Sequence, residues 1–274
     1  MDVITVTDLG IRFKMGKRRR SRTRDALVSW LGGLRNDHGG LRGLIAANQH
    51  GENEFWALRH VTLSVKQGET LGVIGRNGSG KSTLLRVIAG IYPPDEGKVS
   101  VRGEVSTLFS LGAGFQPELS GIDNIYLNGV LMGLSKKEID AILDDIIDFA
   151  ELGEFIHMPV KTYSTGMSSR LGFSIAMNVN KDIVLIDEIM GAGDAAFQEK
   201  AQARLNRIIG ERTIVLVSHS MNTVRQSADH AVWLDKGQIA AQGEPKEVVQ
   251  QYLEATSVQA AQAQTSARSE MSPS

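Results

Sequence analysis

The sequence predicts an α/β fold in which a mostly parallel core sheet carries covering helices and an inserted helical subdomain. From 183 to 242, short apolar segments alternate with segments of helical periodicity, an order that is typical of parallel strands joined by helices. A helix-rich block from about 117 to 178 interrupts the strands and is interpreted as the inserted subdomain. With roughly 150 residues per domain, 274 residues suit one large domain with an excursion as well as two domains.

Hydrophobic periodicity and turn residues predict the individual elements. The segment from Val3 to Phe13 is rich in Val, Ile and Thr and predicts a strand, a turn at Gly10 and a second short strand. Further strands are expected at 60–65, 70–75, 98–101, 104–108, 183–187, 213–218, 231–234 and 238–242. Helices are expected at 81–89, 136–152, 167–178, 196–209, 222–228 and 246–254.

Two segments fall outside this pattern. Residues 14–54 combine a basic run from Lys14 to Arg24 with apolar residues at helical spacing and several glycines, and they predict a basic, amphipathic insert. The Ala-, Gln- and Ser-rich tail, 255–274, is expected to be disordered because it offers little apolar surface to bury. Residues 1–254 are therefore assigned to the folded domain.

Composition argues against several functional classes. The 30 basic and 31 acidic residues give a net charge of −1, which disfavours a nucleic-acid coat protein. The absence of cysteine excludes disulfides, thiolate metal sites and cysteine nucleophiles. We expect neither a signal peptide nor a membrane-spanning helix, because no basic region precedes an apolar run and no run reaches about 18 apolar residues. The six histidines lack metal-ligand spacing.

The strongest functional signal is a glycine-rich loop between an apolar strand and a predicted helix. The segment from Gly75 to Ser82 fits G-x-x-x-x-G-K-[ST], whose backbone N–H groups and lysine surround nucleotide phosphates and whose hydroxyl suits Mg²⁺. The flanking strand and helix make an accidental match improbable. A nucleoside triphosphate is therefore expected to contact Gly75, Asn77, Gly78, Ser79, Gly80, Lys81, Ser82 and Thr83.

Charged residues close two later apolar strands. Asp187 and Glu188 follow an apolar run, where one acid can hold Mg²⁺ through water and its neighbour can polarise an attacking water. Because strand neighbours face opposite ways, Glu188 is expected in the turn beyond the strand. His219 ends another apolar strand at the edge where open α/β sheets bind ligands, so we expect it to contact the γ-phosphate. For each signal alone, a solvated strand end or a structural histidine is the alternative.

Together with these motifs, the segment 163–167 (Tyr-Ser-Thr-Gly-Met) resembles the signature motif of ABC-transporter ATPases. More narrowly, the segment 111–128 and the long insert after Phe13 are similar to ATP-binding subunits that export lipid-linked polysaccharides such as O-antigen, capsule and teichoic acid. The resemblance covers about Val3 to Glu254. It implies a P-loop ABC ATPase that adds an antiparallel β subdomain to the predicted fold.

The resemblance also implies a head-to-tail pair of subunits with two ATP sites. Ser164 and Gly166 are kept although the signature departs from the commoner Leu-Ser-Gly-Gly-Gln, and they would clamp the ATP held by Lys81 of the other copy. A helix start near Gly166 would present free N–H groups to that phosphate. An ordinary Ser-Thr-Gly helix start explains the local sequence equally well.

Other roles follow from the same resemblance. Gln116 would link Mg²⁺ and the attacking water to the helical subdomain, although the proline directly after it shortens the loop. Asp194 would be the acidic residue of the loop after the catalytic Glu188, and Ser82 with Asp187 would hold Mg²⁺. Phe13 would stack on adenine, although an aromatic residue in a strand is usually part of the core.

The implied activity is hydrolysis of ATP, with Mg²⁺, to drive export of a lipid-linked glycan. The protein would be peripheral, at the cytoplasmic face of the cell membrane, and would act with a polytopic permease and without nucleic acid. An importer ATPase is disfavoured by the glycan-type motifs. A non-transport ABC ATPase acting on nucleic acid or the ribosome usually carries a second ATPase domain or a long coiled coil, which 274 residues do not accommodate. A soluble P-loop kinase would leave Ser164 and Gly166 unexplained.

Overall fold

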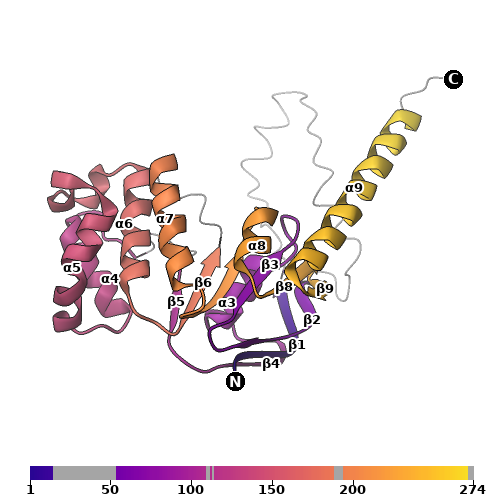
Figure 1. The fold of residues 1–274 in the computed structure, drawn as a ribbon, viewed down its shortest axis with the longest axis horizontal. Coiled ribbons are helices and arrows are strands. Elements are labelled where there is room, and N and C mark those ends of the chain that lie inside the picture. The colour runs from indigo at the N-terminus through magenta and orange to yellow at the C-terminus, as the bar shows by residue number, and fades with distance from the viewer. Residues whose placement is uncertain (15–53, 109–111, 113, 188–193, 271–274) are drawn as a thin grey trace, which may run out of the picture.

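Two sheets, a block of helices and a long carboxyl-terminal helix make up the molecule, a computed structural model that describes residues 1–14, 54–108, 112, 114–187 and 194–270. The larger sheet has six strands in the order β5-β6-β7-β3-β8-β9, and the smaller has three in the order β2-β1-β4. Figure 1 shows the helices α4, α5 and α6 gathered at one end, while α9 extends away from the sheets at the other. The predicted α/β class is confirmed.

The larger sheet is parallel from β5 to β8, and only β9 runs antiparallel to its neighbour. Every residue of β3 and β7 is buried, as expected for apolar strands covered on both faces. The predicted strand 183–187 coincides with β6. The strands are β3 (Thr70–Ile74), β5 (Val105–Thr107), β6 (Ile183–Asp187), β7 (Thr213–Val217), β8 (His230–Asp235) and β9 (Gln238–Gly243).

The smaller sheet corrects the prediction for the amino-terminal segment. Its strands are antiparallel, with β1 (Asp2–Lys14) lying between β2 (Glu54–Lys66) and β4 (Glu96–Val101). The expected turn at Gly10 is wrong, since β1 is one irregular strand. A Cβ at Gly10 would lie 2.9 Å from the Trp56 ring, so this glycine provides room for a neighbouring side chain.

The predicted insert 14–54 leaves and rejoins this sheet at a single point. Lys14 and Glu54 are register partners in β1 and β2. The insert therefore connects two adjacent antiparallel strands without displacing either of them. Its residues 15–53, including the basic run and the expected amphipathic helix, lie outside the described residues.

Helices cover both faces of the larger sheet. On one face, α3 (Lys81–Ile88) packs in a cluster that includes Leu185 and Val217. On the other face, α6 (Thr165–Asn178) and α7 (Ala195–Ile208) pack against Ile186 and Leu216. Strand alternation separates these two clusters, because Leu185 and Ile186 are neighbours that point to opposite faces. The short α8 (Met221–Ser227) and α9 (Pro245–Glu270) share the second face near β3 and β8.

The helical subdomain contains α4 (Gly121–Leu131), α5 (Lys136–Ala150), α6 and two short 3₁₀ helices at 153–157 and 160–162. The α4 helix was not among the expected helices. Two glycines lower its helical propensity, but a Cβ at Gly129 would lie 2.7 Å from the side chain of Ile139. Close packing against α5 therefore accounts for a helix that local propensity does not indicate.

The tail is a second correction. The helix expected to end at Glu254 continues to Glu270, so most of 255–274 is helical rather than disordered. No proline or glycine occurs between Lys246 and Glu270, and Ala and Gln are good helix formers. Helical propensity therefore accounts for the extension of α9 beyond Glu254. Across the described residues, no helix is long and apolar enough to cross a membrane.

Close contact between β3 and α8 gives a stability prediction at Gly72. A Cβ there would lie 2.7 Å from Cγ1 of Val224 and 3.1 Å from Cβ of Ala228. Gly72→Ala is therefore expected to lower the free energy of unfolding by about 1–3 kcal/mol through overpacking. Chemical denaturation of Gly72→Ala, Val224→Ala and the double variant measures this effect. Steric overlap predicts a double variant more stable than the sum of the two losses, and simple additivity would contradict it.

Candidate active site

The glycine-rich loop forms a tight cradle between β3 and α3. Gly75 and Gly80 have φ angles of +149° and +106°, which side chains rarely allow. A Cβ at Gly75 would lie 2.2 Å from the carbonyl oxygen of Leu234, and one at Gly80 would lie 2.7 Å from that of Ala57. Both conformation and space therefore require glycine at these positions. The loop turns directly into the first turn of α3, whose backbone N–H groups favour an anion.

Lys81 lies inside the curve of this loop. Its side chain is buried, and Nζ donates hydrogen bonds to the carbonyl oxygens of Gly75 at 2.7 Å and Arg76 at 3.0 Å. Ser79 is also buried, and its Oγ has no hydrogen-bond partner among the described residues. A buried hydroxyl without a partner is costly unless a ligand satisfies it. The cradle thus presents a cation and a free hydroxyl at one place, as a phosphate group requires.

Three strands bring the other candidate groups to the same sheet edge. Asp187, the last residue of β6, pairs with Val217 of β7, which in turn pairs with Val73 of β3. The cradle begins two residues beyond Val73, and His219 follows two residues beyond Val217 and is exposed. Parallel strands release their carboxyl ends at one edge, where open α/β sheets bind ligands. Glu188 lies outside the described residues.

The donor set at this edge suits Mg²⁺. Ser82 and Thr83 are half-buried in the first turn of α3, and Asp187 is half-buried at the end of β6. Hydroxyl and carboxylate oxygens are ligands that Mg²⁺ accepts, and it commonly takes phosphate oxygens from the substrate as well. No group of three or more His, Asp or Glu side chains that could hold a metal is found in the described residues. Nucleotide oxygens would therefore complete such a site.

Gln116 lies on a loop that a buried asparagine holds in place. The N–H of Gln116 donates to Oδ1 of Asn124 at 2.7 Å, and Nδ2 of Asn124 donates to the carbonyl oxygens of Gln116, Leu119 and Ser120 at 3.1, 3.2 and 2.9 Å. No sequence signal indicates a role for Asn124, which stands in an Asp-Asn pair before an apolar stretch. Gln116 itself is exposed, and its contact with Mg²⁺ stays a prediction.

The segment resembling a signature motif begins a helix. Ser164 is the N-cap of α6, and its Oγ accepts a hydrogen bond from the N–H of Met167 at 3.2 Å. Ser164 is exposed and Gly166 is half-buried, so this helix start is accessible at the surface of the chain. A contact between this helix start and the γ-phosphate held by a second copy stays a prediction.

Asp194 caps the helix that follows β6. Its Oδ1 accepts a hydrogen bond from the N–H of Phe197 at 3.0 Å, and its Oδ2 pairs with the guanidinium of Arg170 at 2.5 Å. The hydrogen bond from Phe197 and the charge of Arg170 lower the pKa of the Asp194 carboxyl. The carboxylate is therefore ionised throughout the neutral range. No signal in the sequence indicates that Arg170 is its partner.

Phe13 belongs to an aromatic cluster at the end of β1 and β2. Its ring centroid lies 5.8 Å from that of Phe55 and 5.6 Å from that of Tyr92, and it packs against the main core. Packing with these rings accounts for its position. Stacking on adenine stays a prediction for Phe13.

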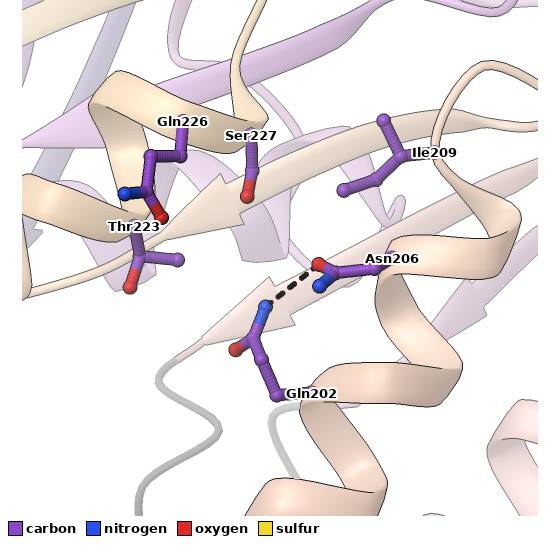
Figure 2. A pocket seen from close by; sticks show the side chains of 6 residues that line it. All are labelled: Gln202, Asn206, Ile209, Thr223, Gln226 and Ser227. Atoms are coloured by element: carbon purple, nitrogen blue, oxygen red, sulfur yellow. Dashed lines mark hydrogen bonds between the residues drawn. The ribbon is translucent and has the colours of Figure 1, made fainter.

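A separate pocket of about 340 Å³ lies between α7 and α8. Figure 2 shows its lining of amide and hydroxyl side chains, with a hydrogen bond of 3.0 Å from Nε2 of Gln202 to Oδ1 of Asn206. None of the predicted site residues lines it. The pocket is polar and uncharged and offers no cation for a phosphate. Its lining is Gln202, Asn206, Ile209, Thr223, Gln226 and Ser227.

Comparison with curated proteins finds relatives over much of the chain. The O-antigen export system ATP-binding protein RfbB of Myxococcus xanthus is 42% identical over 96% of this chain and 58% of its own length. The teichoic acids export ATP-binding protein TagH of Lactococcus lactis is 45% identical over 77% of this chain and 45% of its own length. The ABC transporter protein AbcA of Aeromonas salmonicida is 48% identical over 72% of this chain and 65% of its own length. The chain thus spans about half to two thirds of these relatives.

Solved structures share the fold. A dimeric ATP-binding cassette in a post-hydrolysis state with ADP and Pi matches with a TM-score of 0.65 at 22% identity, over 88% of this chain and 98% of that one. The ATP-binding subunit of an ABC transporter matches with a TM-score of 0.66 at 20% identity, over 91% of this chain and 93% of that one. Residues 58–191 match the family model for the ABC transporter. With the cradle and the sheet order described above, the chain carries a domain of the ABC transporter family.

Proposed function

We propose that this chain is the ATP-binding and ATP-hydrolysing subunit of an exporter that moves a lipid-linked polysaccharide across the cytoplasmic membrane. It acts at the cytoplasmic face as a peripheral protein, together with a polytopic permease and a second copy of itself. The substrate class rests on relatives named as O-antigen and teichoic acid export proteins. The proposal of ATP hydrolysis rests on the residues of the candidate active site in this chain.

The proposal that this chain binds a nucleotide rests on one observation. Within the loop of residues 75–82, the buried ammonium of Lys81 contacts the carbonyl oxygens of Gly75 and Arg76, and the buried hydroxyl of Ser79 has no hydrogen-bond partner among the described residues. A buried hydroxyl without a partner is costly unless a ligand satisfies it. A polyphosphate would bring an acceptor to this hydroxyl and negative charge to the ammonium.

The chain's own residues divide the chemistry among them. The cradle binds and orients the phosphates, and Ser82, Asp187 and Gln116 are the residues that would hold Mg²⁺, which would neutralise charge on the phosphate oxygens. Glu188 directly follows Asp187 and would take the proton of the attacking water. His219 would contact the γ-phosphate from the neighbouring strand end. Closure of two copies around ATP and reopening after hydrolysis would drive the permease.

The arrangement of the helices supports a head-to-tail dimer. The start of α6, which carries Ser164 and Gly166, packs within the helical subdomain, in a cluster separate from the one that contains α3. In the proposed dimer, this helix start of one copy would meet the γ-phosphate on Lys81 of the other copy. Dimeric cassettes occur among the structures with this fold.

The export proposal is tested in the host that carries the gene. Deletion is expected to remove the polysaccharide from the cell surface and to accumulate lipid-linked glycan inside the cell. The wild-type gene should restore export, and a gene with Lys81→Ala should not. Surface glycan and lipid-linked intermediates are measured by labelled-sugar incorporation after fractionation. Unchanged surface polysaccharide in the deletion strain would contradict export while leaving ATP hydrolysis to be measured on the purified chain.

A further inference from the structure

A tight turn that belongs to none of the motifs contacts the glycine-rich loop. Asp235 of β8 and Gln238 of β9 are register partners. Only Lys236 and Gly237 therefore form the turn between these strands, and both have left-handed φ angles, +46° and +80°, as in a type I′ turn. The N–H of Gly237 donates a hydrogen bond to the carbonyl oxygen of Ser79 at 3.0 Å. The turn is thus bonded directly to the backbone of the loop.

The same hairpin also contacts the beginning of the loop. The carbonyl oxygen of Leu234, near the end of β8, would lie 2.2 Å from a Cβ at Gly75, so the two backbones are in close contact. Gly75 is the first residue of the loop, and Ser79 lies four residues further along the chain. The hairpin backbone therefore contacts the loop at two separate places.

Strand β2 holds the turn in this position. The N–H of Arg59 donates to the carbonyl oxygen of Gly237 at 2.9 Å. A Cβ at Gly237 would lie 2.7 Å from the carbonyl oxygen of Ala57, and a Cβ at Gly80 would lie at the same distance from it. Gly237 is also buried. The turn, the loop and β2 therefore meet through backbone atoms, with no room for a side chain between them.

We propose that Gly237 is a positioning residue for ATP and acts through the carbonyl group of Ser79. This inference rests on the proposed binding of nucleotide phosphates by the glycine-rich loop. The peptide group between Ser79 and Gly80 is planar and trans, so its carbonyl and its N–H point in opposite directions. By holding the carbonyl oxygen of Ser79, Gly237 fixes the direction of the Gly80 N–H. Gly80 is the N-cap of α3, and N–H groups at a helix start bind phosphate.

The hydrogen bond to Ser79 is not needed to form the hairpin itself. Strands β8 and β9 pair from Ala231 and Gly243 to Asp235 and Gln238. A two-residue type I′ turn closes such a ladder without help from another segment. A turn with a purely structural role would therefore affect the stability of the chain but not its affinity for ATP.

Gly237→Ala and Gly210→Ala form a matched pair of variants. The φ angle of Gly210 is +84°, close to the +80° of Gly237, so alanine strains both backbones alike. A Cβ at Gly210 meets no heavy atom of the described residues within 4 Å, and no neighbour is displaced there. At position 237, the added Cβ pushes the turn away from Ala57 and weakens its bond to Ser79.

Three measurements compare these variants with the wild type. Titration with a fluorescent ATP analogue gives the affinity, steady-state hydrolysis gives kcat and KM, and thermal unfolding gives the stability. We expect Gly237→Ala to weaken ATP binding and to raise KM, each about tenfold. Because the loop would bind the phosphates in the ground state and the transition state alike, kcat at saturating ATP should stay within about twofold of wild type. Gly210→Ala should lose similar thermal stability and keep the wild-type affinity.

Hydrogen exchange of the wild-type chain tests the contact without any substitution. The Gly237 N–H exchanges when its bond to Ser79 opens. A non-hydrolysable ATP analogue with Mg²⁺ orders the loop and should slow this exchange about tenfold, as measured by NMR. The N–H of Asp229, which donates to the carbonyl oxygen of Thr70 at the other end of β3, is the internal control and should slow less. This measurement decides the question if Gly237→Ala does not fold.

Two results would overturn the positioning role. One is an equal ATP affinity in Gly237→Ala and Gly210→Ala, and the other is equal slowing of exchange at Gly237 and Asp229. Either result, in a wild-type chain that binds ATP, rejects the positioning role and leaves the proposed function standing. A wild-type chain that binds neither ATP nor its analogue contradicts the proposed nucleotide binding, and the positioning role with it.

Discussion

Replacement of Glu188 by glutamine is expected to slow ATP hydrolysis by about 10²- to 10⁴-fold and to leave ATP affinity unchanged. Glu188 directly follows Asp187, the last residue of β6, and in the proposed function its charge would polarise the attacking water. Glutamine keeps the shape, and the cradle at 75–82 is not altered. With hydrolysis blocked, ATP should remain between two copies. A dimer should then accumulate with ATP and Mg²⁺ in size-exclusion chromatography.

Glu199→Gln provides the control for this substitution. Glu199 is an exposed residue of α7, so loss of its charge should change neither the turnover nor the elution volume. Turnover at the wild-type rate in Glu188→Gln would contradict the assignment of the catalytic base. A dimer that forms equally well with ADP would show that the association does not depend on the γ-phosphate.

Lys81→Ala is expected to weaken ATP binding by about 10- to 100-fold, the loss that follows from removing a charged hydrogen-bond donor. Nζ of Lys81 lies at the carbonyl oxygens of Gly75 and Arg76, within the loop that would receive the phosphates. Titration with a fluorescent ATP analogue measures the affinity. Hydrolysis should fall together with binding at subsaturating ATP.

Lys181→Ala is the control for Lys81→Ala. It shows whether the loss of a buried lysine elsewhere in the fold also weakens ATP binding. Lys181 is also buried, but it pairs with Glu104 at 2.7 Å, beside the amino-terminal end of β6. Its removal should lower thermal stability without changing ATP affinity. Equal affinity losses in both variants, or unchanged affinity in Lys81→Ala, would count against the cradle.

Local signals accounted for most of the elements and for the cradle. The expected helices 81–89, 136–152 and 167–178 agree with α3, α5 and α6 to within two residues at each end. Their periodic apolar residues and the capping serines, Ser135 and Ser164, are close together in the sequence. The glycine-rich motif was predictable as well, because its residues are also close together in the sequence. Its backbone conformation requires glycine at fixed positions whatever packs around it.

The two main errors came from reading local signals in the wrong way. Gly10 was interpreted as a turn, although glycine there makes room for Trp56 from another strand. The tail was judged by the apolar surface it could bury, although Ala and Gln favour helix and α9 extends to Glu270. Avoiding the first error would have required knowledge of the strand that pairs with β1. The second error could have been avoided from the sequence alone.

The sequence by itself determined the α/β class, the glycine-rich loop and the position of Asp187 and His219 at or just beyond the ends of two strands, because each depends on residues close together in the chain. Only the tertiary structure decided how distant segments meet. It placed the buried Asn124 under the loop of Gln116, put α3 and α6 on opposite faces of one sheet, and paired Arg170 with Asp194. Such contacts depend on the relative position of packed helices and strands, which no local periodicity or spacing specifies.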